Sequence, residues 1–237
     1  MNSNLKMKSY KCILFDLDHT LWDYETNSRE ALSELYLQFD LKKKGILSDS
    51  DLYKTFYTIN NELWDLYDRG LIHRDVIRNE RFHKILKELG VDDYEMSLRF
   101  SDEYLQHSPK KKNLMDGCKE TLDYLLPKYP LVIVTNGFDE IQSTKLMSSG
   151  IHHYFKDVVT SARAGHKKPS KEIFEFALNE NNVKAHETIM IGDNLLTDIA
   201  GAKNASIDSV FYNPSGIGHQ SSVNFEISTL RELMNFL

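Results

Sequence analysis

The segment Lys11-Cys-Ile-Leu-Phe-Asp-Leu-Asp-His-Thr20 joins four consecutive apolar residues to two closely spaced acids. Continuous rather than alternating hydrophobicity is typical of a strand that is buried on both faces, as in a parallel sheet. Open α/β sheets bind ligands beyond the carboxyl ends of their strands, so Asp16 and Asp18 stand where a site is expected. Residues two apart in an extended chain point to the same side, and both carboxylates can therefore face one cavity.

Similar apolar runs recur after residue 130. Two are strong, Leu131–Thr135 and Thr188–Gly192, and two are weaker, residues 157–160 and 207–211. The helical stretches that alternate with them are residues 139–149, 170–181 and 195–204. This alternation indicates βαβ units, so we predict an α/β fold with a Rossmann-like parallel sheet core and helices on both faces.

The region between residues 22 and 110 has a different pattern. It contains no β-branched run, and its amphipathic stretches are residues 27–39, 49–68, 73–89 and 92–107. Within the second stretch, Leu52, Phe56, Ile59 and Leu63 recur at spacings of three and four, which places one apolar stripe along a helix. We therefore expect a core domain formed by residues 1–21 and 111–237, into which residues 22–110 are inserted as an α-helical domain.

Composition narrows the class of protein. The 237 residues include 29 Lys and Arg against 35 Asp and Glu, and the resulting net charge of −6 argues against a nucleic-acid polymer as partner. No apolar run approaches the ~20 residues that a membrane span needs, and the first ten residues lack the apolar region of a signal peptide. Cys12 and Cys118 lie far apart, as suits a reducing compartment. We expect a cytoplasmic monomer or homodimer with a small-molecule partner.

Two further strands are followed by polar residues. Thr135-Asn136-Gly137 follows one of them, and Gly192-Asp193-Asn-Leu-Leu-Thr-Asp198 follows another. Together with the acids after the first strand, four aspartates would meet at one sheet edge, where their repulsion requires a cation. Oxygen ligands favour Mg²⁺. Lys168, just before a predicted helix, would add positive charge for an anionic substrate.

These segments, in this order, resemble the motifs of the haloacid dehalogenase (HAD) superfamily, whose phosphatases use an aspartate nucleophile. The matching positions are Asp16-x-Asp18-x-Thr20, Thr135, Lys168 and Gly192-Asp193-x-x-x-x-Asp198. The helical insert is similar to the C1-type cap of that superfamily, so the resemblance extends over nearly the whole chain.

The resemblance implies a role for each matching residue. Asp16 would attack phosphorus to form an aspartyl-phosphate, and Asp18 would act as general acid and then as general base. Phosphate oxygens would be bound by Thr135, Asn136 and Lys168. The implied Mg²⁺ ligands are Asp16, the backbone carbonyl of Asp18, Asp193 and Asp198, the last either through water or by fixing Lys168.

The resemblance further implies a Mg²⁺-dependent phosphatase for a small phosphomonoester. The first motif and the Gly-Asp-Asn-Leu-Leu-Thr-Asp segment are similar to those of the nucleoside 5′-monophosphate phosphatases (5′-nucleotidases). Candidate specificity residues are Trp22 beside the first motif and Trp64, Arg78 and Arg81 in the cap, for a base or a second anion.

Other functions on the same fold stay open. They are a sugar-phosphate phosphatase or phosphomutase, a 2-haloacid dehalogenase, and a non-catalytic phosphate-binding regulator. Asp18 argues against the dehalogenase, because departure of a halide needs no proton, and Thr20 favours a phosphatase over a mutase. An intact set of motif residues argues against the regulator.

Overall fold

The computed structural model describes residues 9–237 and divides into two compact units. One unit joins the segment that ends at Asp23 to Asn113–Leu237, and the other is Tyr24–Lys112. The helical unit therefore begins and ends slightly later in the sequence than the predicted insertion, residues 22–110. Residues 1–8, within the stretch where we expect no signal peptide, lie outside the described part of the chain.

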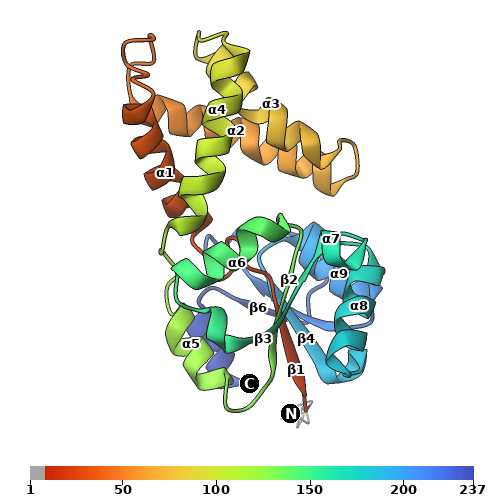
Figure 1. The fold of residues 1–237 in the computed structure, drawn as a ribbon. Helices are drawn as coiled ribbons and strands as arrows, with labels where there is room; N and C mark the ends of the chain where they lie inside the picture. Colours follow the sequence, from red (N-terminus) through yellow and green to blue (C-terminus); the bar gives the residue numbers. More distant parts are fainter. Residues whose placement is uncertain (1–8) are drawn as a thin grey trace. The chain divides into compact units, whose positions relative to one another are not determined.

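The first unit is built on a parallel sheet of six strands in the order β3-β2-β1-β4-β5-β6 (Figure 1). This order and the parallel pairing confirm the predicted Rossmann-like core. The strands are β1 (Cys12–Phe15), β2 (Leu131–Thr135), β3 (Phe155–Thr160), β4 (Thr188–Gly192), β5 (Asp208–Tyr212) and β6 (Phe225–Ile227).

Strand β1 lies at the point where the strand order reverses. Leu14 pairs with Val132 of β2 on one side and with Met190 of β4 on the other. After β3 the chain therefore crosses to the opposite side of β1, and the loops that follow β1 and β4 diverge. Ligands of open α/β sheets bind in the crevice at such a switch point, beyond the carboxyl ends of the strands.

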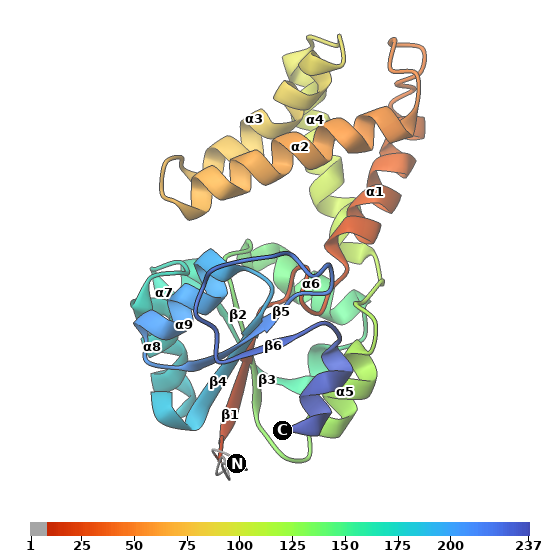
Figure 2. The same ribbon diagram turned by 180° about the vertical axis from the view of Figure 1, so that it is seen from behind.

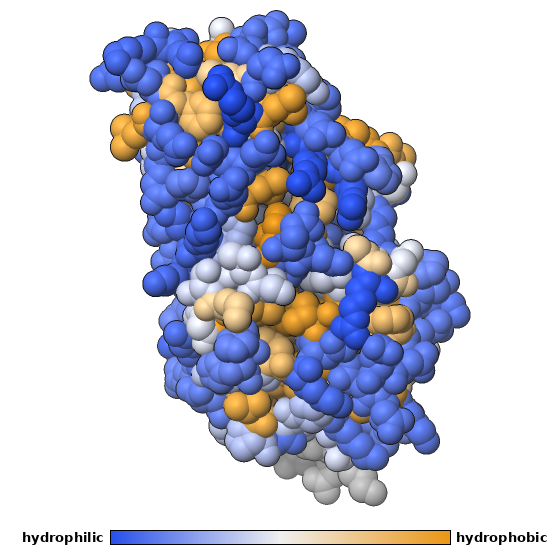
Figure 3. All heavy atoms as spheres, in the orientation of Figure 1, coloured by the Kyte–Doolittle hydropathy of each residue, from blue (hydrophilic) through white to orange (hydrophobic). Residues whose placement is uncertain are grey.

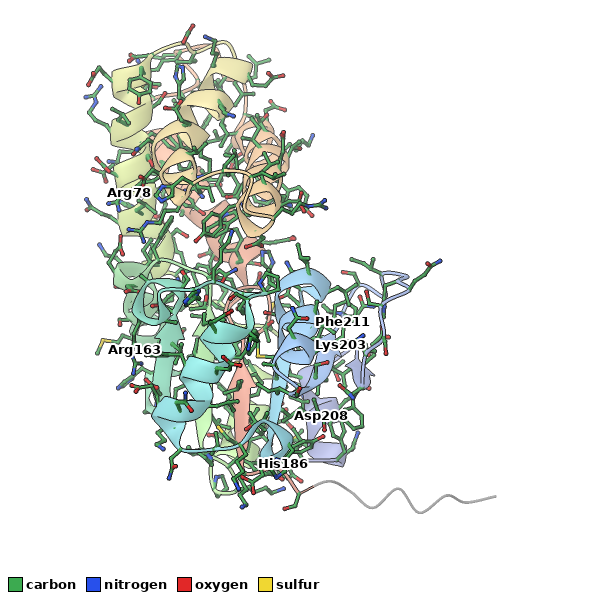
Figure 4. All side chains as sticks on the ribbon, turned by 90° about the vertical axis from the view of Figure 1, so that its right-hand side faces the viewer. Arg78, Arg163, His186, Lys203, Asp208 and Phe211 are labelled. Atoms are coloured by element: carbon green, nitrogen blue, oxygen red, sulfur yellow. The ribbon has the colours of Figure 1, made fainter. Side chains whose placement is uncertain are left out.

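Helices cover both faces of this sheet (Figures 1 and 2). Alternate strand residues such as Leu14, Val134 and Met190 pack against Phe174 of α8, and the residues between them face the other side, as the period of two requires. One side carries α7 (Ser161–Ala164), α8 (Lys171–Asn181) and α9 (Ala200–Asn204), and the other carries α5 (Cys118–Leu125) and α6 (Asp139–Ser148). In Figure 4, His186 and Asp208 mark the amino-terminal edge of the sheet, and Phe211 lies nearer to its carboxyl edge.

Several elements depart from the predicted pattern. Strand β6 and the helices α5 and α7 were not predicted; β6 has only three residues, of which Ile227 alone is buried. The helix expected over residues 195–204 is divided into a π-helical turn, Leu195–Ile199, and the short helix α9. The backbone carbonyl of Asn194 accepts the N–H groups of Asp198 (2.9 Å) and of Ile199 (3.2 Å), and the bond to the residue five positions on widens the turn. The Asn194 side chain caps the same turn by accepting the N–H groups of Leu196 and Thr197. Such π-turns occur often at functional sites.

The second unit consists of helices packed around aromatic rings. Phe82 lies with its ring centroid 4.9 Å from that of Phe100, 5.0 Å from that of Tyr104 and 5.9 Å from that of Phe56. Ser48, His73 and Asp93 each accept a backbone N–H as N-cap residues, which fixes where three of the helices begin. The helices are α1 (Tyr24–Gln38), α2 (Asp49–Asp68), α3 (Arg74–Glu88) and α4 (Tyr94–His107).

The polar surface and the unpaired cysteines of the structure agree with what the amino-acid composition predicts. Hydrophilic residues predominate on the face shown in Figure 3. Within residues 9–237, no helix is both long enough and apolar enough to span a membrane. Both cysteines are buried and free, and burial raises the pKa of Cys12 to about 11 and that of Cys118 to about 12, so both thiols stay protonated at neutral pH.

We expect Phe82→Ala to destabilise the helical unit by about 3–5 kcal/mol, because it removes a buried ring from the centre of the aromatic cluster. Hydrogen exchange should report the loss in Tyr24–Lys112 and leave the protection of the sheet unchanged. Tyr57→Ala removes a ring that is 44% exposed on α2 and serves as the control. Equal losses of protection in the two variants would contradict this packing account.

Candidate active site

The first acidic segment continues directly from β1. The backbone N–H of Asp16 donates to the carbonyl of Ile191 (2.9 Å), which extends the pairing with β4 beyond Phe15 and places Asp16 at the switch point. The chain then turns at His19, whose φ of 62° is in the left-handed region. This turn brings Thr20 close to β4, where its hydroxyl donates to the Asp193 carboxylate (2.9 Å).

The loop after β4 folds a second acid back onto the strand end. The Asp198 carboxylate accepts the backbone N–H of Asn194 (3.0 Å). A Cβ on Gly192 would lie 2.2 Å from Asp198 Oδ2, so the carboxylate occupies space that only glycine leaves open at this position. The π-helical turn therefore holds Asp198 against the end of β4, fully buried.

Lys168 joins the two acidic segments. Its ammonium donates to Asp16 Oδ1 (2.6 Å) and to Asp198 Oδ1 (2.6 Å), and the residue is only 2% exposed. The side chain of Asn136 binds the lysine backbone from both ends of its amide: Nδ2 donates to the Lys168 carbonyl (3.0 Å), and Oδ1 accepts the Lys168 N–H (2.8 Å). The loop after β2 thus fixes the loop that carries the lysine, in which the peptide bond to Pro169 is cis.

The side chains of Thr135 and Asn136 form hydrogen bonds with the backbone of neighbouring loops. The Thr135 hydroxyl accepts the backbone N–H of Gly137 (3.0 Å) at the end of β2. Contacts of both residues with phosphate stay predictions. For Asn136, the observed bonds describe a residue that positions Lys168.

Burial and mutual repulsion shift the ionisation of these groups. Burial raises the pKa of Asp16; Lys168 opposes the rise, but the charges of Asp198 and Asp193 add to it, and the pKa stays well above its ordinary value. Burial, with the charge of Asp198, raises the pKa of Asp193 to about 7. Burial alone would lower the pKa of Lys168, but Asp16 and Asp198 raise it above its ordinary value. These shifts agree, because Asp16, Asp193 and Asp198 carry more negative charge than the single ammonium of Lys168, bonded to Asp16 and Asp198, can offset.

The acids have the composition and spacing of a divalent-metal site. One carboxylate oxygen each from Asp16, Asp193 and Asp198 can be chosen so that all three lie within 4.8 Å of one another. Hard oxygen donors favour Mg²⁺, and two positive charges would balance the excess left by Lys168. The residues present therefore fit the predicted metal.

Asp18 has a partner that sequence reasoning missed. The ammonium of Lys145 donates to Asp18 Oδ1 (2.6 Å) and Oδ2 (2.7 Å), and it lies 4.5 Å from the centroid of the Trp22 ring. Lys145 is on α6, where Gln142, Lys145 and Leu146 form the buried face. Two polar residues three apart on the apolar side of a short helix are the signal that could have identified this lysine.

The candidate specificity residues lie in different environments. Trp22 is fully buried in the first unit, whereas Trp64, with its ring against Tyr67, is half-buried on α2. Arg78 is exposed on α3 (Figure 4). Arg81 is buried inside the helical unit, where it donates to Asn60 Oδ1 (2.8 Å) and lies over the rings of Phe56, Phe82 and Tyr104.

Comparison with known proteins assigns the family. Residues 13–212 match the haloacid dehalogenase-like hydrolases, a stretch that includes the motif residues and the helical insert. The chain belongs to this family and is a hydrolase of the HAD superfamily, which confirms the predicted resemblance.

Among its relatives is YfnB, a HAD-hydrolase of Bacillus subtilis, which is 32% identical over 98% of this chain and 97% of its own length. A crystal structure of YfnB bound to magnesium superimposes with a TM-score of 0.86 and covers 96% of this chain and 98% of that one. The pyrimidine 5′-nucleotidase PynA of Streptococcus pneumoniae is 31% identical over 96% and 95% of the two chains. A glyceraldehyde 3-phosphate phosphatase of Methanothermobacter thermautotrophicus is 30% identical over 86% and 85%.

We expect the metal-free protein to lose stability as the pH rises from 5 to 7, and Asp193→Asn to lose less. The folded pKa of Asp193, about 7, lies above its unfolded value of 3.8, so the folded state holds the proton more tightly over this window. The difference should be of the order of 2 kcal/mol, since one pKa unit corresponds to about 1.4 kcal/mol. Thermal melts in EDTA at both pH values measure it. Parallel pH profiles of wild type and variant would contradict the assignment.

Proposed function

We propose that this chain is a Mg²⁺-dependent phosphatase that hydrolyses a small phosphomonoester through an aspartyl-phosphate on Asp16. The observation that carries the proposal is the buried Asp16 carboxylate at the switch point, bonded to Lys168, with Asp18 two residues further on. A carboxylate is repelled by a phosphate dianion unless cations offset the charge. Lys168 supplies one such cation beside the nucleophile.

The chain's own residues account for both halves of the reaction. An Asp16 oxygen attacks phosphorus, the bond from phosphorus to the leaving alkoxide breaks, and Asp18 gives the alkoxide its proton. Water then attacks the same phosphorus, the bond to Asp16 breaks, and Asp18 takes a proton from the water. Throughout, Lys168 and the Thr135 hydroxyl bind phosphoryl oxygens and stabilise the charge that develops on them.

Asp16, the backbone carbonyl of Asp18 and Asp193 would hold Mg²⁺. When bound, the ion supplies positive charge at the phosphoryl oxygens. Because both Asp198 oxygens already accept hydrogen bonds, from Lys168 and from Asn194, we assign Asp198 to fixing the lysine. The magnesium-bound structure of YfnB supports the choice of metal.

A nucleoside 5′-monophosphate is the substrate that we favour, and the similarity to the pyrimidine 5′-nucleotidase PynA supports it. In this proposal Tyr24–Lys112 is the cap that selects substrates. Trp64 would stack on a base, and the exposed Arg78 would face a second anion. Arg81 is buried among aromatic rings and bonded to Asn60, so we assign it to the packing of the cap and not to substrate contact. Trp22, which follows the first motif, is fully buried against the Lys145 ammonium, so we assign it no direct contact with the leaving group. We place the enzyme in the cytoplasm, as a monomer or homodimer.

A sugar-phosphate or triose-phosphate phosphatase is the second candidate. The similarity to the glyceraldehyde 3-phosphate phosphatase favours it, since that relative is nearly as similar in sequence as PynA. Both candidates use the same core chemistry and differ only in the group that the cap must recognise. The role of Asp16 in catalysis and the choice of substrate by the cap can therefore be tested separately.

Asp16→Asn should lower phosphatase activity toward 4-nitrophenyl phosphate at least about 10³-fold, because the amide removes the nucleophile. EDTA should abolish wild-type activity, and Mg²⁺ should restore it. Asp116→Asn, in which an exposed carboxylate paired with Arg231 is changed, is the control. Full activity of Asp16→Asn would refute the mechanism.

Wild-type kcat/KM should be higher for nucleoside 5′-monophosphates than for glyceraldehyde 3-phosphate and hexose phosphates, measured by phosphate release. Trp64→Ala should raise KM for nucleotides roughly 10-fold, since stacking of a base on an aromatic ring contributes about 1–3 kcal/mol. The same variant should leave KM for 4-nitrophenyl phosphate closer to the wild-type value, and Tyr57→Ala on the same helix is the control. Higher kcat/KM for the sugar phosphates would favour the second candidate.

A further inference from the structure

We propose that Lys145 is a positioning residue that holds Asp18 for the second half of the reaction, the hydrolysis of the aspartyl-phosphate. This inference rests on the proposed function. It concerns a lysine outside the four motifs that identify the family, and it follows from the contacts of that lysine with Asp18 and Trp22.

The contact between Lys145 and Asp18 is close and largely shielded from water. The ammonium lies 2.6 and 2.7 Å from the two oxygens of one carboxylate, and the side chains are 6% and 24% exposed. The Trp22 ring centroid lies 4.5 Å from the same ammonium, which adds cation–π attraction on another side. The side chain of Asp18 is therefore held in one orientation.

A buried lysine is costly where packing alone is required. Ordering its side chain costs up to about 2 kcal/mol, and desolvation of the charge costs more, so leucine or methionine would fill the same space at lower cost. Asp18 does not share the lysine that binds the other acids, because Lys168 pairs with Asp16 and Asp198. Each of the two catalytic aspartates thus has its own buried lysine.

The form of Asp18 that Lys145 binds points to one step of the reaction. An ammonium can only donate hydrogen bonds, so it binds both oxygens of the ionised carboxylate. The ionised carboxylate is the form that accepts a proton when water attacks the aspartyl-phosphate. In that step the water oxygen bonds to phosphorus, the bond from phosphorus to Asp16 breaks, and the proton passes from the water to Asp18.

The test uses 4-nitrophenyl phosphate, whose leaving group departs without a proton, so that formation of the aspartyl-phosphate does not depend on Asp18. Lys145→Met should show a burst of nitrophenol close to one equivalent per enzyme, followed by turnover slowed about 10- to 100-fold. Since only breakdown of the intermediate is slowed, KM should fall with kcat, and kcat/KM should stay within about threefold of wild type. Lys145→Arg keeps a donor for both oxygens and should recover part of kcat.

Two further comparisons separate positioning from a general structural effect. Lys11→Met removes another lysine that is paired with a carboxylate, that of Glu187, where the chain enters β1, and should behave as wild type. In an Asp18→Asn background, Lys145→Met should change kcat little, because the lysine acts through Asp18.

The outcomes distinguish this inference from the proposed function. An active wild type with an unchanged Lys145→Met variant, or with kcat/KM lowered as much as kcat and no burst, would overturn the role of Lys145 alone. A wild type that does not hydrolyse the aryl phosphate at all would overturn the proposed function and this inference with it.

Discussion

The arrangement of the core site depends on the buried ammonium of Lys168, which two carboxylates share. Asp16 comes from the end of β1 and Asp198 from the turn after β4, and without a common cation these charges would repel each other in a buried setting. The lysine is in turn fixed through its backbone by Asn136, which follows β2. The loops that follow β1, β2 and β4 are thereby joined to the loop that carries Lys168, at the edge of the sheet where the parallel strands present their carboxyl ends.

Charge is distributed unevenly in this cluster, and the imbalance serves the proposed reaction. Lys168 offsets only part of the charge of Asp16, Asp193 and Asp198. Burial, together with the charge of Asp198, raises the pKa of Asp193 to about 7. The carboxylates of the site carry more negative charge than its lysine can neutralise, and a divalent cation would balance the excess. In the proposed reaction, that cation and Lys168 together would attract a phosphate. The carboxylate of Asp18 pairs with a different lysine, Lys145 on α6.

Much of the core was predictable because its signals are local in sequence. Strands buried on both faces appear in the sequence as continuous apolar runs, and the motif acids directly follow these runs. Their positions along the chain therefore place the acids at the carboxyl ends of the strands. Lys145 was missed because its importance depends on which face of α6 meets the β1 loop, a tertiary property. Strand β6 was missed because three residues with one buried side chain carry almost no pattern. The π-turn at residues 195–199 was missed because the sequence of one turn does not distinguish backbone bonds that span four residues from those that span five.

The ends of the helical insertion lie side by side in the core. The backbone N–H of Asp23 donates to the carbonyl of Asn113 (3.1 Å), and Trp22 and Leu114 form an antiparallel bridge just inside them. Because its two ends are adjacent, the helical insertion connects to the sheet in the same way as a short loop would. A change in the length of the inserted segment therefore need not alter the register of the strands. The sheet and the helical insertion can therefore fold around separate cores while they are joined by only two neighbouring segments of chain.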